Sequence, residues 1–282
     1  MSRFVVGKKE VDAFLQKSLM WNQEGIAFAY ASAPEVLREI IPPQLEVAFP
    51  MVGGYVVQIK ESNLGGPTME VGLYVPVRLK RNGPVYSYFL EFIVHGPGAF
   101  NSLTQGREIF GTPKKVADSI DMWRIGNKAA AKVVRNGVTL IDVEMDIDGA
   151  YNTPAGAMLL GQPGATKSTG TNLFYRYFLE RTEDGGVKFL DGQLASNQKE
   201  TDIASYEAGK LRIKMQSSLN DPLGELEVVQ PLGAAFFKYS ETRIIRCGKL
   251  MDVENIDEIV PYLLTTRYDR GNMGDAEMFY SC

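Results

Sequence analysis

Two Asn-Gly dipeptides, each between β-rich segments, constrain the fold of this chain more than any other feature of the sequence. Asn82-Gly83 lies between residues 70–80 and 84–95, and Asn136-Gly137 lies between residues 132–135 and 138–141. Asn-Gly readily adopts the backbone angles of the tight turn that joins two antiparallel strands. The sequence therefore predicts two β-hairpins.

Most of the remaining chain is also predicted to be β-structure. The other segments with strand character are 45–60, with a break at Gly53-Gly54, 171–180, 187–194, 203–216 and 224–243. They contain β-branched and aromatic residues and are bounded by turn-forming residues. A sheet of many strands is therefore expected.

Helices are expected near the two ends of the chain. One is predicted near the N-terminus by apolar residues at helical spacing: Val11, Phe14, Leu15 and Leu19. A second is expected to start at Ser32 and Glu35, which have capping-box spacing, and to stop at Pro42-Pro43. A third is expected over 254–264.

The composition fits one folded unit. Of the 282 residues, 45% are apolar, and no linker or repeat interrupts the β segments. We therefore expect a single domain over 1–282, of the α+β class, with a large antiparallel, partly closed, barrel-like sheet and a few flanking helices. Residues 266–282 lack periodicity and are expected to form a flexible tail or an arm on a neighbouring subunit.

Net charge and cysteine content limit the classes of binding partner and the cell compartment that are expected. A net charge of −4 and a pI near 5.3 argue against nucleic acid or an anionic membrane as the main partner. The apolar run at the N-terminus is too short for a signal peptide, and no later run reaches the length of a membrane span. The two cysteines, Cys247 and Cys282, suit a reducing cytoplasm.

The chain contains a single histidine, His95. A Ser-His-Asp triad could be built only around it, and multi-histidine metal sites are excluded. Because a lone histidine before a glycine-rich turn is most often buried or turn-capping, an enzyme of this sequence would move protons with Lys, Glu, Asp or Tyr.

Two further motifs favour ordinary structural roles. GQPGATKS, residues 161–168, resembles a phosphate-binding loop, but Thr166 replaces the glycine before the lysine and a strand, not a helix, is expected to follow. DVEMDID, residues 142–148, places its carboxylates on one face of a strand. Such side chains point outward in a row, so that a solvated face is favoured over a metal site.

GREIFGTPKK, residues 106–115, places Lys114 and Lys115 directly behind a Gly-Thr-Pro turn. On spacing alone the pair is interpreted as solvated, like Lys8-Lys9, because lysine is rarely buried without a partner. If the pair is buried, burial and the neighbouring cation both disfavour the ammonium form of one lysine. A neutral amine is what attack on a ketone, to form a Schiff base, requires.

This segment resembles the active-site segment of the acetoacetate decarboxylase family, in which a Gly-Arg-Glu run leads into Pro-Lys-Lys. The resemblance covers about residues 25–245, including EVLREIIPPQLEV, MEVGLYVPV, TNLFYRYF, YEAGKLRIKM and LNDPLGELEVV in the order of the family. It implies the fold of that family, with Lys114 as the Schiff-base lysine and Lys115 as the cation that keeps it uncharged. It also implies Glu70 as an active-site glutamate at the imine, and it favours supporting ion pairs over substrate contacts for Arg107 and Glu108.

Two positions depart from the pattern of the family. The arginine associated with the substrate carboxylate falls near Gln23, and a second glutamate falls near Tyr55. Gln23 would hold a carboxylate less firmly than a cation, whereas an iminium at Lys114 would still act as an electron sink. A phenol could instead move a proton at the β-carbon, and Tyr55 and Tyr239 are the candidates.

The leading hypothesis is a cytoplasmic Schiff-base lyase that acts on a small keto acid through Lys114. Aldol condensation and dehydration is favoured narrowly over decarboxylation of acetoacetate or another β-keto acid. The rival of another class is a catalytically silent relative that binds a carbonyl ligand or serves as a subunit in an assembly. No cofactor and no metal are expected, and the resemblance implies a homo-oligomer.

Overall fold

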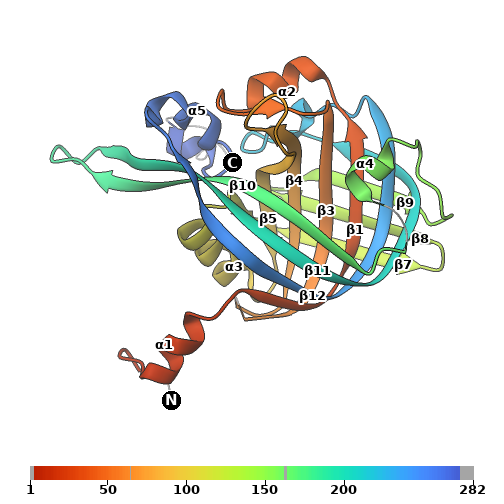
Figure 1. The fold of residues 1–282 in the computed structure, drawn as a ribbon, viewed down its shortest axis with the longest axis horizontal. Coiled ribbons are helices and arrows are strands. Elements are labelled where there is room, and N and C mark those ends of the chain that lie inside the picture. The colour runs from red at the N-terminus through yellow and green to blue at the C-terminus, as the bar shows by residue number, and fades with distance from the viewer. Residues whose placement is uncertain (1–2, 64, 162–163, 274–282) are drawn as a thin grey trace.

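The protein folds around one continuous sheet that closes on itself (Figure 1). The structure is a computed structural model and describes residues 3–63, 65–161 and 164–273. The strands are β1 (Leu19–Ala31), β2 (Glu46–Val47), β3 (Met51–Ser62), β4 (Thr68–Arg78), β5 (Tyr86–His95), β6 (Lys114–Val116), β7 (Ser119–Ile125), β8 (Lys128–Arg135), β9 (Val138–Asp146), β10 (Lys167–Arg181), β11 (Val187–Met215) and β12 (Gln230–Asp252).

The helices are short and lie around the sheet. The α-helices are α1 (Lys8–Phe14), α2 (Pro34–Ile40), α3 (Ala99–Gln105), α4 (Gly156–Leu160) and α5 (Val260–Leu263). A π-helical turn, η1 (Gly106–Phe110), follows α3, and the 3₁₀ turns are η2 (Leu223–Glu225), η3 (Ile256–Glu258) and η4 (Arg270–Met273).

Within the described residues, seven strands form a closed ring in the order β10-β5-β4-β3-β1-β12-β11, because β11 also pairs with β10. Neighbours in the ring are antiparallel, except for β10 and β5, which are parallel at Asn172↔Ser87 and Leu173↔Tyr88. From β11 the sheet continues through β9, β8 and β7, and β6 pairs with β5 in parallel. The expected class, with a large and partly closed sheet, is confirmed, and the sheet is mixed rather than wholly antiparallel.

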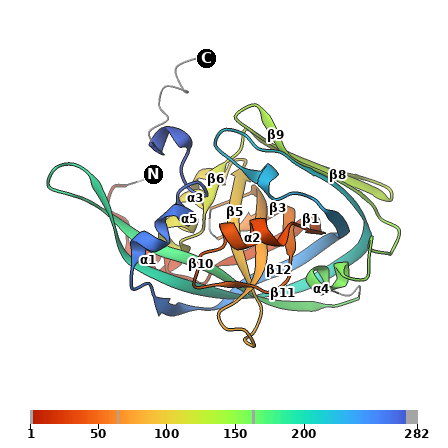
Figure 2. The same ribbon diagram turned by 90° about the horizontal axis from the view of Figure 1, so that it is seen from above.

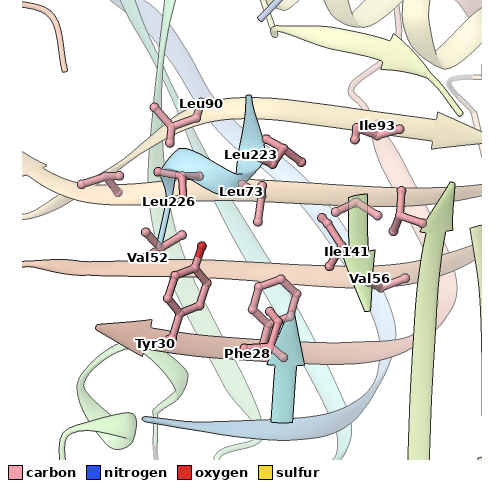
Figure 3. Close-up of a cluster of buried hydrophobic side chains, with 14 of the residues drawn as sticks. Phe28, Tyr30, Val52, Val56, Leu73, Leu90, Ile93, Ile141, Leu223 and Leu226 are labelled. Atoms are coloured by element: carbon pink, nitrogen blue, oxygen red, sulfur yellow. The ribbon is translucent and has the colours of Figure 1, made fainter. Parts of the chain in front are cut away.

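The main hydrophobic core lies on the outer face of the ring. Because alternate residues of a strand point to opposite faces, each ring strand presents one row of side chains to this core and another to the ring interior. Phe28 of β1, Val56 of β3 and Leu73 of β4 are buried in the core together with Ile141 of β9 and Leu223 of η2. Figure 3 shows these side chains between the ring strands and the strands that cross them. Seen from above, β8 and β9 cover one side of the ring (Figure 2).

Both predicted hairpins are present. The strands β8 and β9 are antiparallel, and Asn136 and Gly137 between them have φ angles of 51° and 73°, as a tight hairpin turn requires. The strands β4 and β5 are also antiparallel, but residues 79–85 connect them, and the N–H of Gly83 donates to the carbonyl of Lys80 at 2.8 Å. Only the second Asn-Gly therefore forms a two-residue turn.

Several of the described strands differ from those predicted. No strand was expected at 19–31, yet β1 lies between β3 and β12 in the ring and begins at Leu19. Gly53-Gly54 does not break β3, because the space of the missing side chains is filled by the rings of Tyr74 and Phe28. The segment predicted as two strands, 187–194 and 203–216, is the single long strand β11.

The predicted helices are shorter and less regular than expected. The helix α1 forms, but its apolar side chains are exposed and it extends away from the ring (Figure 1). The N-cap of α2 is Ala33, so that the predicted capping box is wrong, and Pro34 occupies the first turn. The helix predicted over 254–264 consists of η3 and α5, because Pro261 cannot continue a run of helical hydrogen bonds.

The start of the predicted flexible tail is packed against the ring. Arg267 is buried and donates to the carbonyls of Gly111 and Tyr175, and Asp269 accepts two hydrogen bonds from Arg135. The expectation of a flexible tail is therefore wrong for residues 266–273, and residues 274–282 lie outside the described part of the chain.

The weaker motifs take ordinary roles. In β9, Glu144 and Asp146 pair with Arg212 on an exposed face, as expected for a solvated strand. The glycine-rich segment 161–168 leads into β10 rather than a helix, and its residues 162 and 163 lie outside the described residues. The half-buried His95 places Nδ1 3.4 Å from the carbonyl oxygen of Ala117. None of the described helices has the length and apolar character needed to span a membrane.

Candidate active site

A cavity of about 500 Å³ lies inside the ring, and all seven ring strands contribute side chains to its wall. Small-molecule sites in proteins commonly enclose about 300–1,000 Å³. Apolar and aromatic side chains make up most of the wall. Among the described residues that line it, the charged ones are Glu70, Lys114 and Lys199.

Strand β6 separates the two adjacent lysines. Successive side chains of a strand point to opposite faces, so that Lys114 faces the cavity while Lys115 faces the other side of the sheet. Both are buried, with exposed fractions of 8% and 3%. The interpretation of a solvated pair is therefore wrong, and the two ammonium groups do not share one pocket.

The residues before β6 bring Lys114 close to a helix. A Cβ atom at Gly106, the first residue of η1, would lie 2.6 Å from Thr112 Oγ1 and 2.8 Å from Lys114 Cδ. Gly111 has a φ angle of 73°, a left-handed conformation that glycine adopts at little cost. Helical turns of the π type often occur at functional sites. Both glycines of GREIFGTPKK thus serve to place the lysine side chain.

Lys114 is held by two polar side chains from different elements. Its Nζ lies 2.6 Å from Glu70 Oε2 of β4 and 2.8 Å from Ser102 Oγ of α3. It also lies 5.4 Å from the centre of the Phe92 ring. Since the lysine and glutamate side chains are each about nine-tenths buried, water screens their interaction only weakly.

Tyr55 is the second partner of Glu70. Its hydroxyl donates to Glu70 Oε1 at 3.0 Å, so that both carboxylate oxygens are engaged. Burial, followed by the charge of Glu70, raises the pKa of the Tyr55 phenol well above its usual value of 10.0. The phenol therefore stays protonated and acts as a hydrogen-bond donor in the cavity.

Stacked phenylalanines form the apolar wall beside Lys114. Phe89 and Phe92 of β5 stack with ring centres 4.4 Å apart, and Phe174 of β10 lies 5.8 Å from Phe89. Gly72 leaves room for this group, because a Cβ atom there would lie 2.7 Å from the Tyr55 ring and 2.8 Å from Phe89. The charged pair thus lies beside a surface suited to an apolar ligand.

Gln23 and Tyr239, both named as candidates in the sequence analysis, also line the cavity. Gln23 is buried, and its Nε2 donates to Thr242 Oγ1 at 2.8 Å. Tyr239 stacks on Phe237 with ring centres 4.2 Å apart, and burial raises the pKa of its phenol above the usual value. The structure therefore brings Lys114, Glu70, Tyr55, Gln23 and Tyr239 to one cavity.

Lys115 belongs to a buried ion cluster behind the cavity. Its Nζ lies 2.7 Å from Asp221 Oδ1 and 3.5 Å from Glu91 Oε1, and Arg135 bonds both Asp221 and Asp269. Burial raises the pKa of Glu91 from 4.5 to about 8, against the opposing charge of Lys115. For Asp221, the two cations outweigh burial and lower the pKa. With Glu91 uncharged, two cations face two carboxylates, and the cluster is balanced.

Arg107 and Glu108 lie outside the cavity wall, on η1. The guanidinium of Arg107 lies over the ring of Tyr268, 5.0 Å from its centre, and Glu108 is exposed. In the described part of the chain neither residue forms an ion pair, so that the expected supporting ion pairs are wrong.

Ser102 and Lys199 are among the polar residues of the cavity that sequence reasoning missed. Ser102 contacts Lys114 from α3, a helix that was not predicted, and Lys199 lies on the part of β11 that was assigned to no strand. Asn197, Lys199 and Thr201 alternate along β11 and all line the cavity. A continuous strand prediction would have placed them on one face.

The closed ring of strands forms a barrel, and its interior cavity has the size of a small-molecule site and contains a lysine–glutamate pair. A family model described as acetoacetate decarboxylase (ADC) matches residues 5–258. The chain therefore belongs to the acetoacetate decarboxylase family, which supports its being an enzyme.

Relatives in this family have different names. The chain is 37% identical over 276 residues to the CLA biosynthesis isomerase of Lactiplantibacillus plantarum, covering 96% of each chain. It is 32% identical over 174 residues to acetoacetate decarboxylase of Burkholderia mallei, covering 59% of this chain and 69% of that one.

Solved structures share the fold at low sequence identity. Acetoacetate decarboxylase from Legionella pneumophila superposes with a TM-score of 0.72 at 16% identity, covering 90% of this chain and 100% of that one. The enduracididine biosynthesis enzyme MppR, in complex with the condensation product of pyruvate and imidazole 4-carboxaldehyde, gives a TM-score of 0.63 at 15% identity over 88% and 98%.

Proposed function

We propose that this protein is a Schiff-base enzyme in which Lys114 attacks the carbonyl carbon of a substrate bound in the ring cavity. The observation that carries the proposal is the 2.6 Å contact between Lys114 Nζ and Glu70 Oε2 in a largely apolar cavity. A nucleophile needs a proton acceptor within hydrogen-bond distance, and Glu70 supplies one.

The proposed reaction begins when Glu70 accepts a proton from the Lys114 ammonium. The neutral amine adds to the carbonyl carbon, Glu70 returns its proton to the resulting hydroxyl group, which leaves as water, and an iminium forms. The iminium withdraws electrons from the adjacent carbon, so that the Glu70 carboxylate can remove a proton there and give an enamine. Return of a proton and hydrolysis release the product and restore the amine.

We favour isomerisation of an unsaturated carbonyl compound as the overall reaction. If a double bond lies one carbon beyond the enamine, a proton delivered at its far end shifts the double bond into conjugation, and no atom is gained or lost. Support comes from the relative named as an isomerase, which matches over 96% of its length, and from the phenylalanine wall, which suits an apolar chain.

A Schiff-base lyase that acts on a small keto acid is the second candidate. The Tyr55 hydroxyl, 3.0 Å from Glu70 Oε1, favours aldol condensation and dehydration, because that reaction needs a second proton-transfer group near the β-carbon. Simple decarboxylation is less favoured. The charged group that contacts Lys114 is the Glu70 carboxylate, which repels a substrate carboxylate held at the same place.

For Lys115 we propose a positioning role. Its contacts with Asp221 and Glu91 hold β6 in place beside β5, with which it pairs in parallel, and this sets the direction of Lys114 on the other face of the sheet. The positive charge of Lys115 is matched by carboxylates, so that little of it acts on Lys114.

Borohydride trapping tests the proposal. The protein is incubated with a ketone, borohydride is added, and the modified peptide is identified by mass spectrometry. We expect one adduct, on the peptide that contains Lys114, in the wild type and in a Lys9→Ala control on exposed α1, and none in Lys114→Ala. Absence of an adduct with every ketone and keto acid tried would leave a carbonyl-binding protein without catalysis.

The reaction class is then decided by three signals recorded on one sample. Exchange of substrate hydrogen for deuterium reports proton removal, a rise in conjugated-enone absorbance without a second substrate reports isomerisation, and released carbon dioxide reports decarboxylation. A new carbon–carbon bond formed only with an added aldehyde reports the aldol reaction. Glu70→Gln is expected to keep some adduct formation and to lose the deuterium exchange.

A further inference from the structure

The cavity contains a second lysine, Lys199, that the proposed chemistry at Lys114 does not use. Lys199 lies on β11, and its half-buried side chain extends into the ring interior. Its Nζ lies 5.7 Å from the centre of the Tyr55 ring on β3. Because β12 and β1 separate β11 from β3 in the ring, the side chain reaches across the interior.

Lys199 differs in its partners from Lys114, Lys115 and Arg135. Lys114 pairs with Glu70, and Lys115 and Arg135 pair with Asp221. Within the described residues, no carboxylate lies at ion-pair distance from Lys199. Partial burial of a cation without a counter-ion is unfavourable, and an anionic ligand offsets that cost.

The surroundings of Lys199 also present unused polar groups. Asn197, two residues earlier on the same face of β11, is buried, and its Oδ1 has no hydrogen-bond partner among the described residues. Burial lowers the pKa of the Lys199 ammonium, and Glu70 only partly opposes this. Such groups are typical of a site that is completed by a ligand rather than by the protein.

We propose that Lys199 binds the carboxylate of an oxo-acid substrate whose carbonyl group reaches Lys114. This inference rests on the proposed Schiff base at Lys114 and names the class of its substrate. Lys199 supplies the cation that Gln23, an uncharged side chain occupied by Thr242, does not.

The position of Tyr55 separates the two ends of such a substrate. Its hydroxyl contacts Glu70, which contacts Lys114, whereas the face of its ring lies toward Lys199. The carbonyl and carboxylate groups are therefore bound on two sides of one tyrosine. This favours oxo acids with a carbon chain between the two groups over β-keto acids such as acetoacetate.

The test compares levulinate, a keto acid, with its methyl ester. The fraction of Lys114 trapped by borohydride is measured against ligand concentration in the wild type, in Lys199→Met and in Lys199→Arg. We expect Lys199→Met to raise the apparent Kd for levulinate about 10- to 100-fold, as loss of a charge-assisted hydrogen bond does. The ester is expected to change less than about twofold, and Lys199→Arg to retain most levulinate affinity. Lys188→Met, on the exposed end of β11, is the matched control.

Two results would overturn the inference. One is an equal loss of affinity for levulinate and its ester in Lys199→Met with an unchanged melting temperature, which would indicate a structural lysine. The other is a wild-type adduct on the peptide of Lys199, which would make it the nucleophile.

Calorimetry of levulinate binding without borohydride separates the two proposals. If no adduct forms at Lys114 but levulinate still binds more weakly to Lys199→Met, the Schiff-base function fails and the carboxylate site stands. If the adduct forms and calorimetry shows no difference between the wild type and Lys199→Met, the carboxylate site fails alone.

Discussion

Glu91 gives the sharpest quantitative prediction, because its buried carboxyl is held protonated at neutral pH. Burial raises its pKa from 4.5 to about 8. A raised folded-state pKa means that the native protein binds the proton more tightly than the unfolded chain. The associated stability is fully present below about pH 4.5 and is lost as the pH rises through about 8. At about 1.4 kcal/mol for each pH unit between 4.5 and 8, the full loss is roughly 5 kcal/mol.

Glu91→Gln removes this titration while keeping the size and the hydrogen-bonding capacity of the side chain. The free energy of unfolding is measured by urea titration for both proteins at intervals from about pH 5 to about pH 9. Relative to the wild type, the variant is expected to gain stability with pH up to about pH 8, by a few kcal/mol, and then to level off. Glu108→Gln, at an exposed position on η1, controls for the loss of one acidic group. A difference between wild type and Glu91→Gln that does not change with pH would refute the reasoning.

Three further substitutions test other parts of the site. Lys115→Gln leaves Asp221 with one cation fewer, so we expect the free energy of unfolding, measured in urea, to fall by roughly 3–5 kcal/mol. The pH–rate profile is expected to keep its position, and a shifted acid limb with unchanged stability would contradict this. Gly106→Ala places a Cβ atom 2.8 Å from Lys114 Cδ, so that borohydride trapping is expected to slow more than about tenfold while the circular dichroism spectrum is retained. Trapping at the rate of the wild type would show that the helix can move aside. Tyr55→Phe removes a hydrogen bond to Glu70 and is expected to slow deuterium exchange about 10- to 100-fold while adduct formation is preserved. An equal loss of deuterium exchange and adduct formation would assign the phenol to substrate binding instead.

Local turn chemistry made part of the fold predictable. Asn136-Gly137 forms the expected turn because both residues adopt positive φ angles without help from the rest of the protein. The ring strand β1 was not predictable in the same way, because Leu19 continues the apolar spacing of α1 and because the strand is stabilised by partners distant in sequence. The capping spacing of Ser32 and Glu35 was misleading, since the chain starts the helix at Pro34.

The residues of the site could be predicted where the family pattern contains them and where they lie on a strand that the sequence predicts. Lys114 and Glu70 meet because β6 and β4 both lie beside β5, a pairing that spacing in the sequence does not contain. Lys199 was missed because the polar run Asn197-Gln198-Lys199-Glu200 looks like a break between strands. In the ring, successive side chains of β11 point to opposite faces of the sheet, so that Asn197 and Lys199 face the cavity. The homo-oligomer implied by the resemblance stays a prediction.

The opposite directions of Lys114 and Lys115 have a consequence for chemical labelling. Two lysine side chains on neighbouring residues differ in whether a reagent can reach them, because Lys114 faces a cavity and Lys115 is enclosed by the carboxyl groups of Glu91 and Asp221. A small amine-reactive aldehyde will therefore mark one member of the doublet in the native protein and both after unfolding. The face of the three-residue strand β6 to which a lysine points, rather than the identity of the amino acid, decides which amine can react.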